Sequence, residues 1–330
     1  MMLHTPEIQR FNMALGAVIA MAWKERHGVI PGGVVVPGFL VNALILSPAW
    51  CASILLLSLI TLAVYQRWLE GVDQQRRQAM YILGMVSLLL STPIAWLQIQ
   101  VGLLPSSLDS ISGTFLPGVI AFNSHRQGVK QVLSGALAVT AITALATSLV
   151  MWFGSTLLNL DFDQLNQYYR HSNNLRLRAQ MLQCLVALLV GSVLYRRTGM
   201  RPGGYMVAPI AAALLLEPLS AGLFLMGCLG VETGIRWLMR HSLIIGLQRY
   251  VAALLLSIGY VWGMELIFIE LGMEALPFQG NHLLVIIAIL SYANDAVLEG
   301  MRRVLPWMLV MLGSSLLTLM LTQQLLALLS

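Results

Sequence analysis

Apolar residues in this chain gather in long runs instead of alternating with polar ones. The runs AWCASILLLSLITLAVY (residues 49–65) and QVLSGALAVTAITALATSLVMWFG (131–154) reach or approach the roughly 20 residues that cross a bilayer as an α-helix. Six such segments can be drawn in each half of the chain, which predicts an all-α polytopic membrane protein. The segments cover residues 9–23, 28–48, 49–67, 79–101, 112–125 and 130–153, then 179–195, 200–217, 219–237, 243–269, 280–298 and 304–328.

Composition and charge support the membrane prediction and give it a direction. Hydrophobic residues make up 58% of the 330 residues and charged residues only 10%, against roughly a quarter in soluble domains. Of the 19 Lys and Arg residues, 15 fall in alternate loops, and the others are Arg10, Arg170, Arg176 and Arg178. By the positive-inside rule, the basic loops are cytoplasmic and both termini are extracytoplasmic. The net charge of +5 is therefore a topology signal and not a sign of nucleic-acid binding.

A sequence pattern occurs twice, about half a chain apart. Residues 26–36 and 197–207 both fit R-x-G-x-x-P-G-G-x-x-V. A repeat of this length indicates a duplicated domain, and six segments per copy would insert the copies in parallel. We expect one membrane repeat at residues 1–154, an extracytoplasmic linker at 155–178 and a second repeat at 179–330. The repeated residues are Arg26, Gly28, Pro31, Gly32 and Gly33 in the first copy, and Arg197, Gly199, Pro202, Gly203 and Gly204 in the second.

Two segments of the first half are interrupted by proline and glycine. Residues 28–48 include Pro37 and Gly38, and residues 112–125 include Pro117 and Gly118. Both residue types weaken a helix, and in lipid the freed backbone groups need protein or water partners. These segments are either kinked packing helices or discontinuous, re-entrant helices that face each other around a site. We expect residues 28–40 and 113–128 to lie close together.

No catalytic or metal-binding arrangement is visible in the sequence. The phosphate-binding pattern G-x-x-x-x-G-K-[ST] is absent, the six histidines are scattered, and the three cysteines lie singly in apolar segments. Glu217, Glu265 and Asp295 lie in or at the ends of apolar segments, where an ionised group is costly. Of these, Asp295 is the better candidate for a residue on a polar path, because it follows Asn294 in a partly preserved motif.

Two motifs, taken in order, resemble the PgsC/CapC family, whose members are integral membrane subunits of bacterial poly-γ-glutamate synthase. The first motif is GVIPGGVVVPGFL at residues 28–40, and the second is PGVIAFNSHRQG at 117–128. The resemblance covers most of residues 10–153, and the second half resembles a diverged copy. There, YANDAVLEG at 292–300 keeps Ala293, Asn294 and Gly300 but replaces the Arg-Gln pair with Leu298 and Glu299, so we expect the first half to carry the working site.

The resemblance implies a non-catalytic subunit of the bacterial inner membrane. Its expected partner is a cytoplasmic Mur-ligase-like, ATP-dependent amide ligase, so the chain itself needs no cofactor and ATP belongs to the partner. A further extracytoplasmic export subunit would be compatible with this arrangement. Arg26, Arg126 and Arg197 would attract the anionic polymer, or they only set the topology. The remaining candidates for the motif or the path are Asn123, Gln127, Gly128, Asn294, Asp295, Glu299 and Gly300.

Two other functions fit the same pattern. Parallel repeats with broken helices also occur in independent secondary transporters, and a membrane scaffold for another peptide or polysaccharide synthase would look similar. A neighbouring gene for a Mur-ligase-like ATPase would separate the synthase subunit from the transporter.

Overall fold

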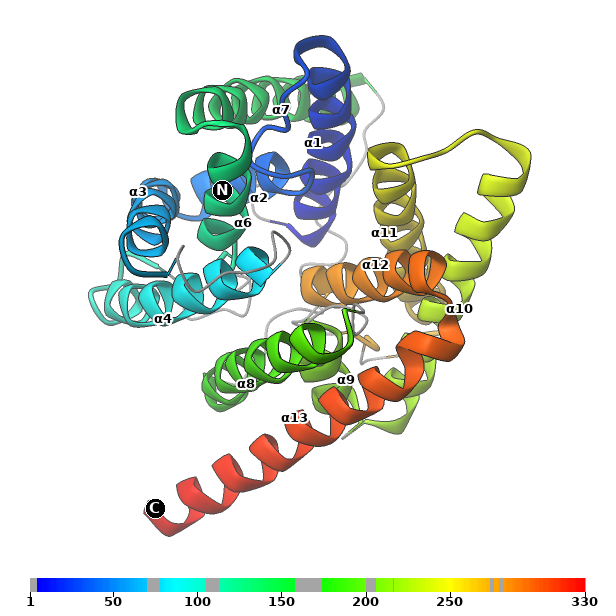
Figure 1. Cartoon of the computed structure of the whole chain (residues 1–330). Coiled ribbons are helices and arrows are strands. Elements are labelled where there is room, and N and C mark those ends of the chain that lie inside the picture. The colour runs from blue at the N-terminus through cyan, green and yellow to red at the C-terminus, as the bar shows by residue number, and fades with distance from the viewer. Residues whose placement is uncertain are drawn as a thin grey trace. The chain divides into compact units, whose positions relative to one another are not determined.

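The computed structural model divides into two compact units, residues 1–171 and 172–330, which are described separately (Figure 1). It describes residues 5–69, 78–104, 113–157, 174–199, 206–215, 217–273, 276–278 and 282–329. All secondary structure in these ranges is helical. The fold is thus the all-α one that the apolar runs predict.

Among its described residues, the first unit contains four long α-helices and two short ones. The long helices are α1 (Pro6–His27), α3 (Pro48–Val64), α4 (Gln78–Gln100) and α7 (Val129–Leu157), and α3 continues into a π-helical turn, η1 (Tyr65–Leu69). The short helices are α2 (Val36–Leu46) and α6 (Leu116–Gln127). Helix α6 packs on α3, α4 and α7, and α2 packs on α1, α3 and α7 (Figure 1). The two short helices therefore lie inside the unit.

The predicted apolar segment at residues 28–48 is only partly helical. Gly28 ends α1 with φ 75°, and the chain stays non-helical to residue 35 before α2 begins. Eleven residues of α-helix rise only about 17 Å, well short of the hydrocarbon core of a bilayer. The prediction of a broken segment is confirmed, and the same holds for α6, whose 12 residues carry Pro117 and Gly118 in the first turn.

The second unit repeats this order of helices. Its helices are α8 (Asn174–Thr198), α9 (Val207–Leu214), α10 (Pro218–His241), α11 (Leu247–Glu270), α12 (His282–Glu299) and α13 (Met301–Leu329). Every pair of helices that packs together in the first unit has its counterpart here: α1–α7 corresponds to α8–α13, α3–α6 to α10–α12 and α4–α6 to α11–α12. Such a match of order and packing is what a tandem duplication produces.

Seven helices among the described residues are long and apolar enough to cross a membrane. They are the helices at Pro48–Leu69, Ala79–Gln100, Val129–Thr156, Pro218–His241, Leu247–Glu270, His282–Glu299 and Met301–Thr322. Outward-facing Leu, Ile, Trp and Phe side chains are frequent on them, as expected for helices in contact with lipid. The chain is a multi-pass membrane protein.

Candidate functional site

The two family motifs of the first half meet at one place. The first part of the first motif forms a non-helical loop, the Pro-Gly-Gly segment (residues 28–35), between α1 and α2, and residues 31–35 of this segment are buried. Gly32 and Gly33 have φ values of 74° and 138°, a region that side chains rarely tolerate. A Cβ atom on Gly33 would also lie 2.9 Å from Cγ1 of Val119 in α6. Glycine is therefore required here both by the backbone and by the neighbouring helix.

Side chains of the second motif hold this loop in place. Gln127 Oε1 accepts a hydrogen bond from the Ile30 N–H over 2.8 Å, and Asn123 Nδ2 donates to the Gly32 carbonyl over 2.9 Å. Gln127 Nε2 also donates to Asn123 Oδ1 over 3.3 Å. We call the bonds from Asn123 and Gln127 to the segment the loop latch. It satisfies backbone groups that no helix satisfies, which is what membrane-embedded irregular backbone requires. The expected proximity of residues 28–40 and 113–128 is confirmed.

Glycines in the Pro-Gly pairs allow the short helices to lie close against their long neighbours. A Cβ atom on Gly38 would come within 2.5 Å of the Asn12 carbonyl oxygen in α1. A Cβ atom on Gly118 would come within 2.9 Å of the Leu83 carbonyl oxygen in α4. The preceding residues, Pro37 and Pro117, lie in the first turns of α2 and α6, where proline costs no helical hydrogen bond.

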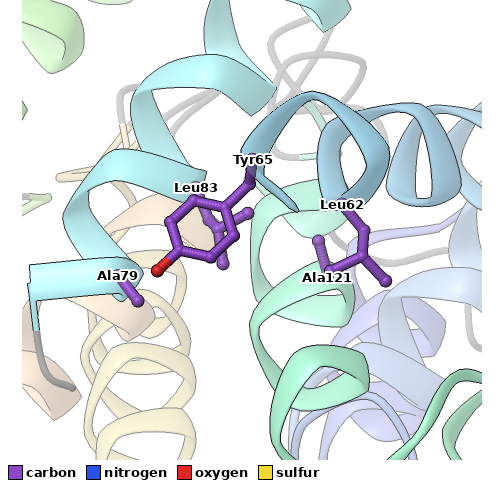
Figure 2. Close-up of a cluster of buried hydrophobic side chains, with 5 residues drawn as sticks. All are labelled: Leu62, Tyr65, Ala79, Leu83 and Ala121. Atoms are coloured by element: carbon purple, nitrogen blue, oxygen red, sulfur yellow. The ribbon is translucent and has the colours of Figure 1, made fainter. Parts of the chain in front are cut away.

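An apolar cluster fixes the helix that carries the latch. Tyr65 of η1 lies among Leu62 of α3, Ala79 and Leu83 of α4, and Ala121 of α6 (Figure 2). All five side chains are buried, and the ring of Tyr65 also meets that of His125 edge-on at 5.2 Å. Because α6 is clamped between α3 and α4, Asn123 and Gln127 project from a rigid support.

The arginines of the motifs are exposed and are not part of the latch. Arg126 reaches over the ring of Phe122, with its guanidinium carbon 5.5 Å from the ring centre. Arg26 lies in the last turn of α1, and Arg197 occupies the equivalent turn of α8. All three side chains are exposed, so they are available to bind an anion or an acidic surface.

The second unit keeps the glycine that ends the helix of the site but replaces the two amide side chains by carboxylates. Gly128 and Gly300 end α6 and α12 in the same way, with φ values of 94° and 88°. Counting back from these glycines, Asp295 stands where the first copy has Asn123, and Glu299 where it has Gln127. A carboxylate cannot donate the bond that Asn123 makes. Pro202, Gly203 and Gly204 lie outside the described residues.

The surroundings of this degenerate motif are also charged. Asn294 and Asp295 are buried in α12, and Asn294 Nδ2 donates to Asp295 Oδ1 over 3.3 Å. On α10, Arg236 forms an ion pair with the buried Glu232 over 2.8 Å. Arg236 also donates to the Ala296 carbonyl over 2.9 Å, which links α10 to α12. This contact holds the two helices together. Arg67, which precedes Trp68 and Leu69 in the first half as Arg236 precedes Trp237 and Leu238 in the second, lies exposed in η1.

Sequence reasoning missed a second polar group in the first unit. Asn12 of α1 donates to Asn42 of α2 over 2.7 Å and accepts a hydrogen bond from Thr147 of α7 over 2.6 Å. Asn42 in turn donates to the Gln9 carbonyl over 3.1 Å. All are buried, and Arg10 beside them is fully buried as well. The available signal was an asparagine inside each of two apolar segments, but the partners lie 30 and 135 residues apart.

Among the described residues, no group of three or more His, Cys, Asp or Glu side chains could hold a metal ion.

Comparisons with known proteins agree with the resemblance of the two motifs to the PgsC/CapC family. No curated protein and no solved structure matches the chain. The family model for capsule biosynthesis CapC matches twice, over residues 15–133 and 186–305, which together make up most of the chain. The chain therefore belongs to the capsule biosynthesis CapC family and carries the family's domain twice in tandem.

Proposed function

We propose that this membrane protein is the subunit of a poly-γ-glutamate synthesis and export complex that anchors a cytoplasmic ATP-dependent amide ligase and assists passage of the growing chain. Membership of the CapC family, shown by two matches in tandem, is the observation that carries the proposal. The family description supports a role in capsule biosynthesis; the partner and the export step are the proposed parts.

The distribution of charge supports contact with an anionic polymer. The end of the first unit that carries the latch also carries Lys24, Arg26, Arg126 and Lys130, at the end of α1 and the junction of α6 and α7. Poly-γ-glutamate has one carboxylate for each residue, and a cluster of exposed cations raises the local concentration of such a chain. By the positive-inside rule this end is cytoplasmic, where a ligase would deliver the product.

The proposed division of labour follows from what the sequence contains. It has no nucleotide-binding motif, and the basic loops between its helices are too short to hold an ATP-binding domain. ATP would therefore be bound by the partner ligase. The first copy, which retains Asn123, Arg126 and Gln127, is assigned the working role, and the second copy is assigned mainly to support.

The test is isolation of the tagged full-length protein from the membranes of its own host, combined with deletion of its gene. We expect a Mur-ligase-like ATPase to co-purify, and deletion to remove the surface polymer. Restoration by the intact gene is the control for effects on neighbouring genes. Normal surface polymer in the deletion strain would contradict the proposal.

A further inference from the structure

We infer that each half of the chain is itself a pair of inverted three-helix repeats, and that the crossing of the two short helices of the first half, α2 and α6, is the gate of a passage inside that half. In the first unit the repeats are α1–α2–α3 and α4–α6–α7 (Figure 1). Each has the order long, short, long. This architecture stands without the proposed function; only the identity of what passes, an anionic polymer, rests on that proposal.

The packing of the helices has the symmetry that such a pair requires. Exchanging the first triplet for the second turns α1–α2 into α4–α6 and α2–α3 into α6–α7. It likewise turns α1–α7 into α4–α3, and α2–α7 into α6–α3. All of these pairs are packed, and the equivalent exchange in the second unit, of α8–α9–α10 for α11–α12–α13, also maps packed pairs onto packed pairs.

The sequence shows the same relation within the first half. GVVVPGFL at residues 33–40 and GTFLPGVI at 113–120 share glycine, a later Pro-Gly pair and apolar residues at the same spacing. The short helices begin at Val36 and Leu116, the same position in each stretch. Both helices lack a side-chain cap at their N-terminus. Local conformation and sequence therefore repeat together.

Each of the two Pro-Gly glycines lies against the same two kinds of backbone atom of a long helix, a carbonyl oxygen and the Cα atom of the next residue. The Cβ position of Gly38 lies 2.5 Å from the Asn12 carbonyl oxygen and 2.6 Å from the Met13 Cα atom. That of Gly118 lies 2.9 Å from the Leu83 carbonyl oxygen and 3.1 Å from the Gly84 Cα atom. Asn12 is the seventh residue of α1 and Leu83 the sixth of α4, so each short helix crosses its long helix at nearly the same point.

The two short helices also contact each other reciprocally. Phe39 of α2 packs edge-on against Phe115, the residue just before α6, with ring centres 5.8 Å apart. Val119 of α6 packs against Gly33, just before α2, and Gly33 in turn lies against Val36. The apolar side chains of Phe39 and Phe115 are buried at this crossing and Val119 is half-buried, so the proposed passage is closed in this structure.

Three is an odd number of segments, so the second triplet runs through the membrane opposite to the first. Inverted repeats whose broken helices meet at the repeat interface are the construction by which transporters open alternately to either side. The Pro-Gly-Gly segment belongs to the first triplet and is held by Asn123 and Gln127 of the second. We therefore assign the loop latch as the contact that must break when this side opens.

The test measures opening directly and needs no polymer. Ala136 is fully buried, and its Cβ lies 3.6 Å from the Cβ position of Gly32, so it is covered by the loop. Ala136→Cys is placed in the full chain with Cys51, Cys184 and Cys228 replaced by alanine, in lipid vesicles, and its reaction with a membrane-permeant maleimide is timed. Combining Asn123→Ala with Gln127→Ala should speed the reaction about tenfold, since lost hydrogen bonds shift an opening equilibrium by about that factor.

A buried position in the other unit serves as the control that separates opening of the loop from unfolding of the protein. Ala187→Cys, an equally buried alanine of the second unit, should keep its rate when the latch is removed. An unchanged labelling rate at residue 136, or an equal rise at residue 187, would overturn the gate.

A second experiment tests the opposite orientation of the two triplets. In cells, an impermeant thiol reagent should label Leu103→Cys, just past α4, and spare Arg26→Cys at the end of α1. Labelling of both or of neither would overturn the inverted repeats, whatever the polymer proves to be.

Discussion

Gly38 and Gly118 lie in equivalent surroundings: each is placed where a short helix touches the backbone of a long one. The Pro-Gly pairs predicted that these segments are broken, because both residue types weaken a helix, but they did not predict the close approach to a neighbouring backbone. The contacts of Asn12, Asn42 and Thr147 were not predictable. A polar residue in an apolar run shows that a partner exists, but not which distant segment supplies it.

Replacing Gly38 by alanine should destabilise the protein by about 1–3 kcal/mol, because the added methyl group would overlap the backbone of α1. The change in thermal unfolding temperature of the purified protein in detergent measures this. Gly222→Ala is the matched control, since Gly222 lies in α10 with nothing within 4 Å of its Cβ position. Equal shifts for both variants would show that the close approach is not required.

Substituting Arg126 by lysine should lower polymer output severalfold while leaving the topology unchanged. The charge remains, but the planar guanidinium that can bind a carboxylate through two hydrogen bonds is lost. Arg302→Lys, which changes an exposed arginine of the diverged copy, should be nearly silent. Polymer yield is compared at matched amounts of protein in the membrane. If both variants give near-normal yields, the first copy does not carry the working site.

At the scale of elements, the sequence predicted which segments are broken but not how long the helical parts are. Residues 28–48 were drawn as one segment, whereas the helix covers only Val36–Leu46. The first eight residues stay non-helical because Gly28, Gly32 and Gly33 adopt positive φ values and because Asn123 and Gln127 supply hydrogen bonds that a helix would have made. That second cause depends on residues about 90 positions away and is invisible in a local pattern.

Linking the Pro-Gly-Gly segment to α7 should stop polymer export reversibly. The Cβ atom of Pro31 lies 3.5 Å from the Cβ position of Gly135, within the range of a disulfide. In a background without native cysteines, oxidation of Pro31→Cys with Gly135→Cys should abolish surface polymer, and reduction should restore it. Each single variant, treated identically, is the control. Export by the oxidised double variant at the rate of the single variants would show that the loop does not move.

At the scale of the whole molecule, the duplication could be predicted because R-x-G-x-x-P-G-G-x-x-V is too long a pattern to recur by chance. The matched helix packing of the two units and the two family matches confirm it. The inverted relation inside each half was not predicted. It rests on GVVVPGFL and GTFLPGVI, whose shared residues are few and become persuasive only when the helices that contain them are seen to pack equivalently.

The two halves have diverged where the latch lies. Asp295 and Glu299 replace the amides of Asn123 and Gln127, while the helix-ending glycines Gly128 and Gly300 remain. Backbone geometry was retained and side-chain chemistry was not. This is the pattern expected if one copy works on the polymer and the other maintains the fold of the pair.

The central claim is that this chain is a non-catalytic subunit whose function requires a separate ligase. The most direct measurement is ATP-dependent synthesis of γ-linked glutamate by the purified full-length protein in lipid, by the co-isolated ligase, and by the two together. We expect no amide synthesis or ATP hydrolysis by this chain alone, and polymer that reaches the opposite side of the vesicle membrane only when both are present. ATP-dependent amide synthesis by this chain without any companion would contradict it.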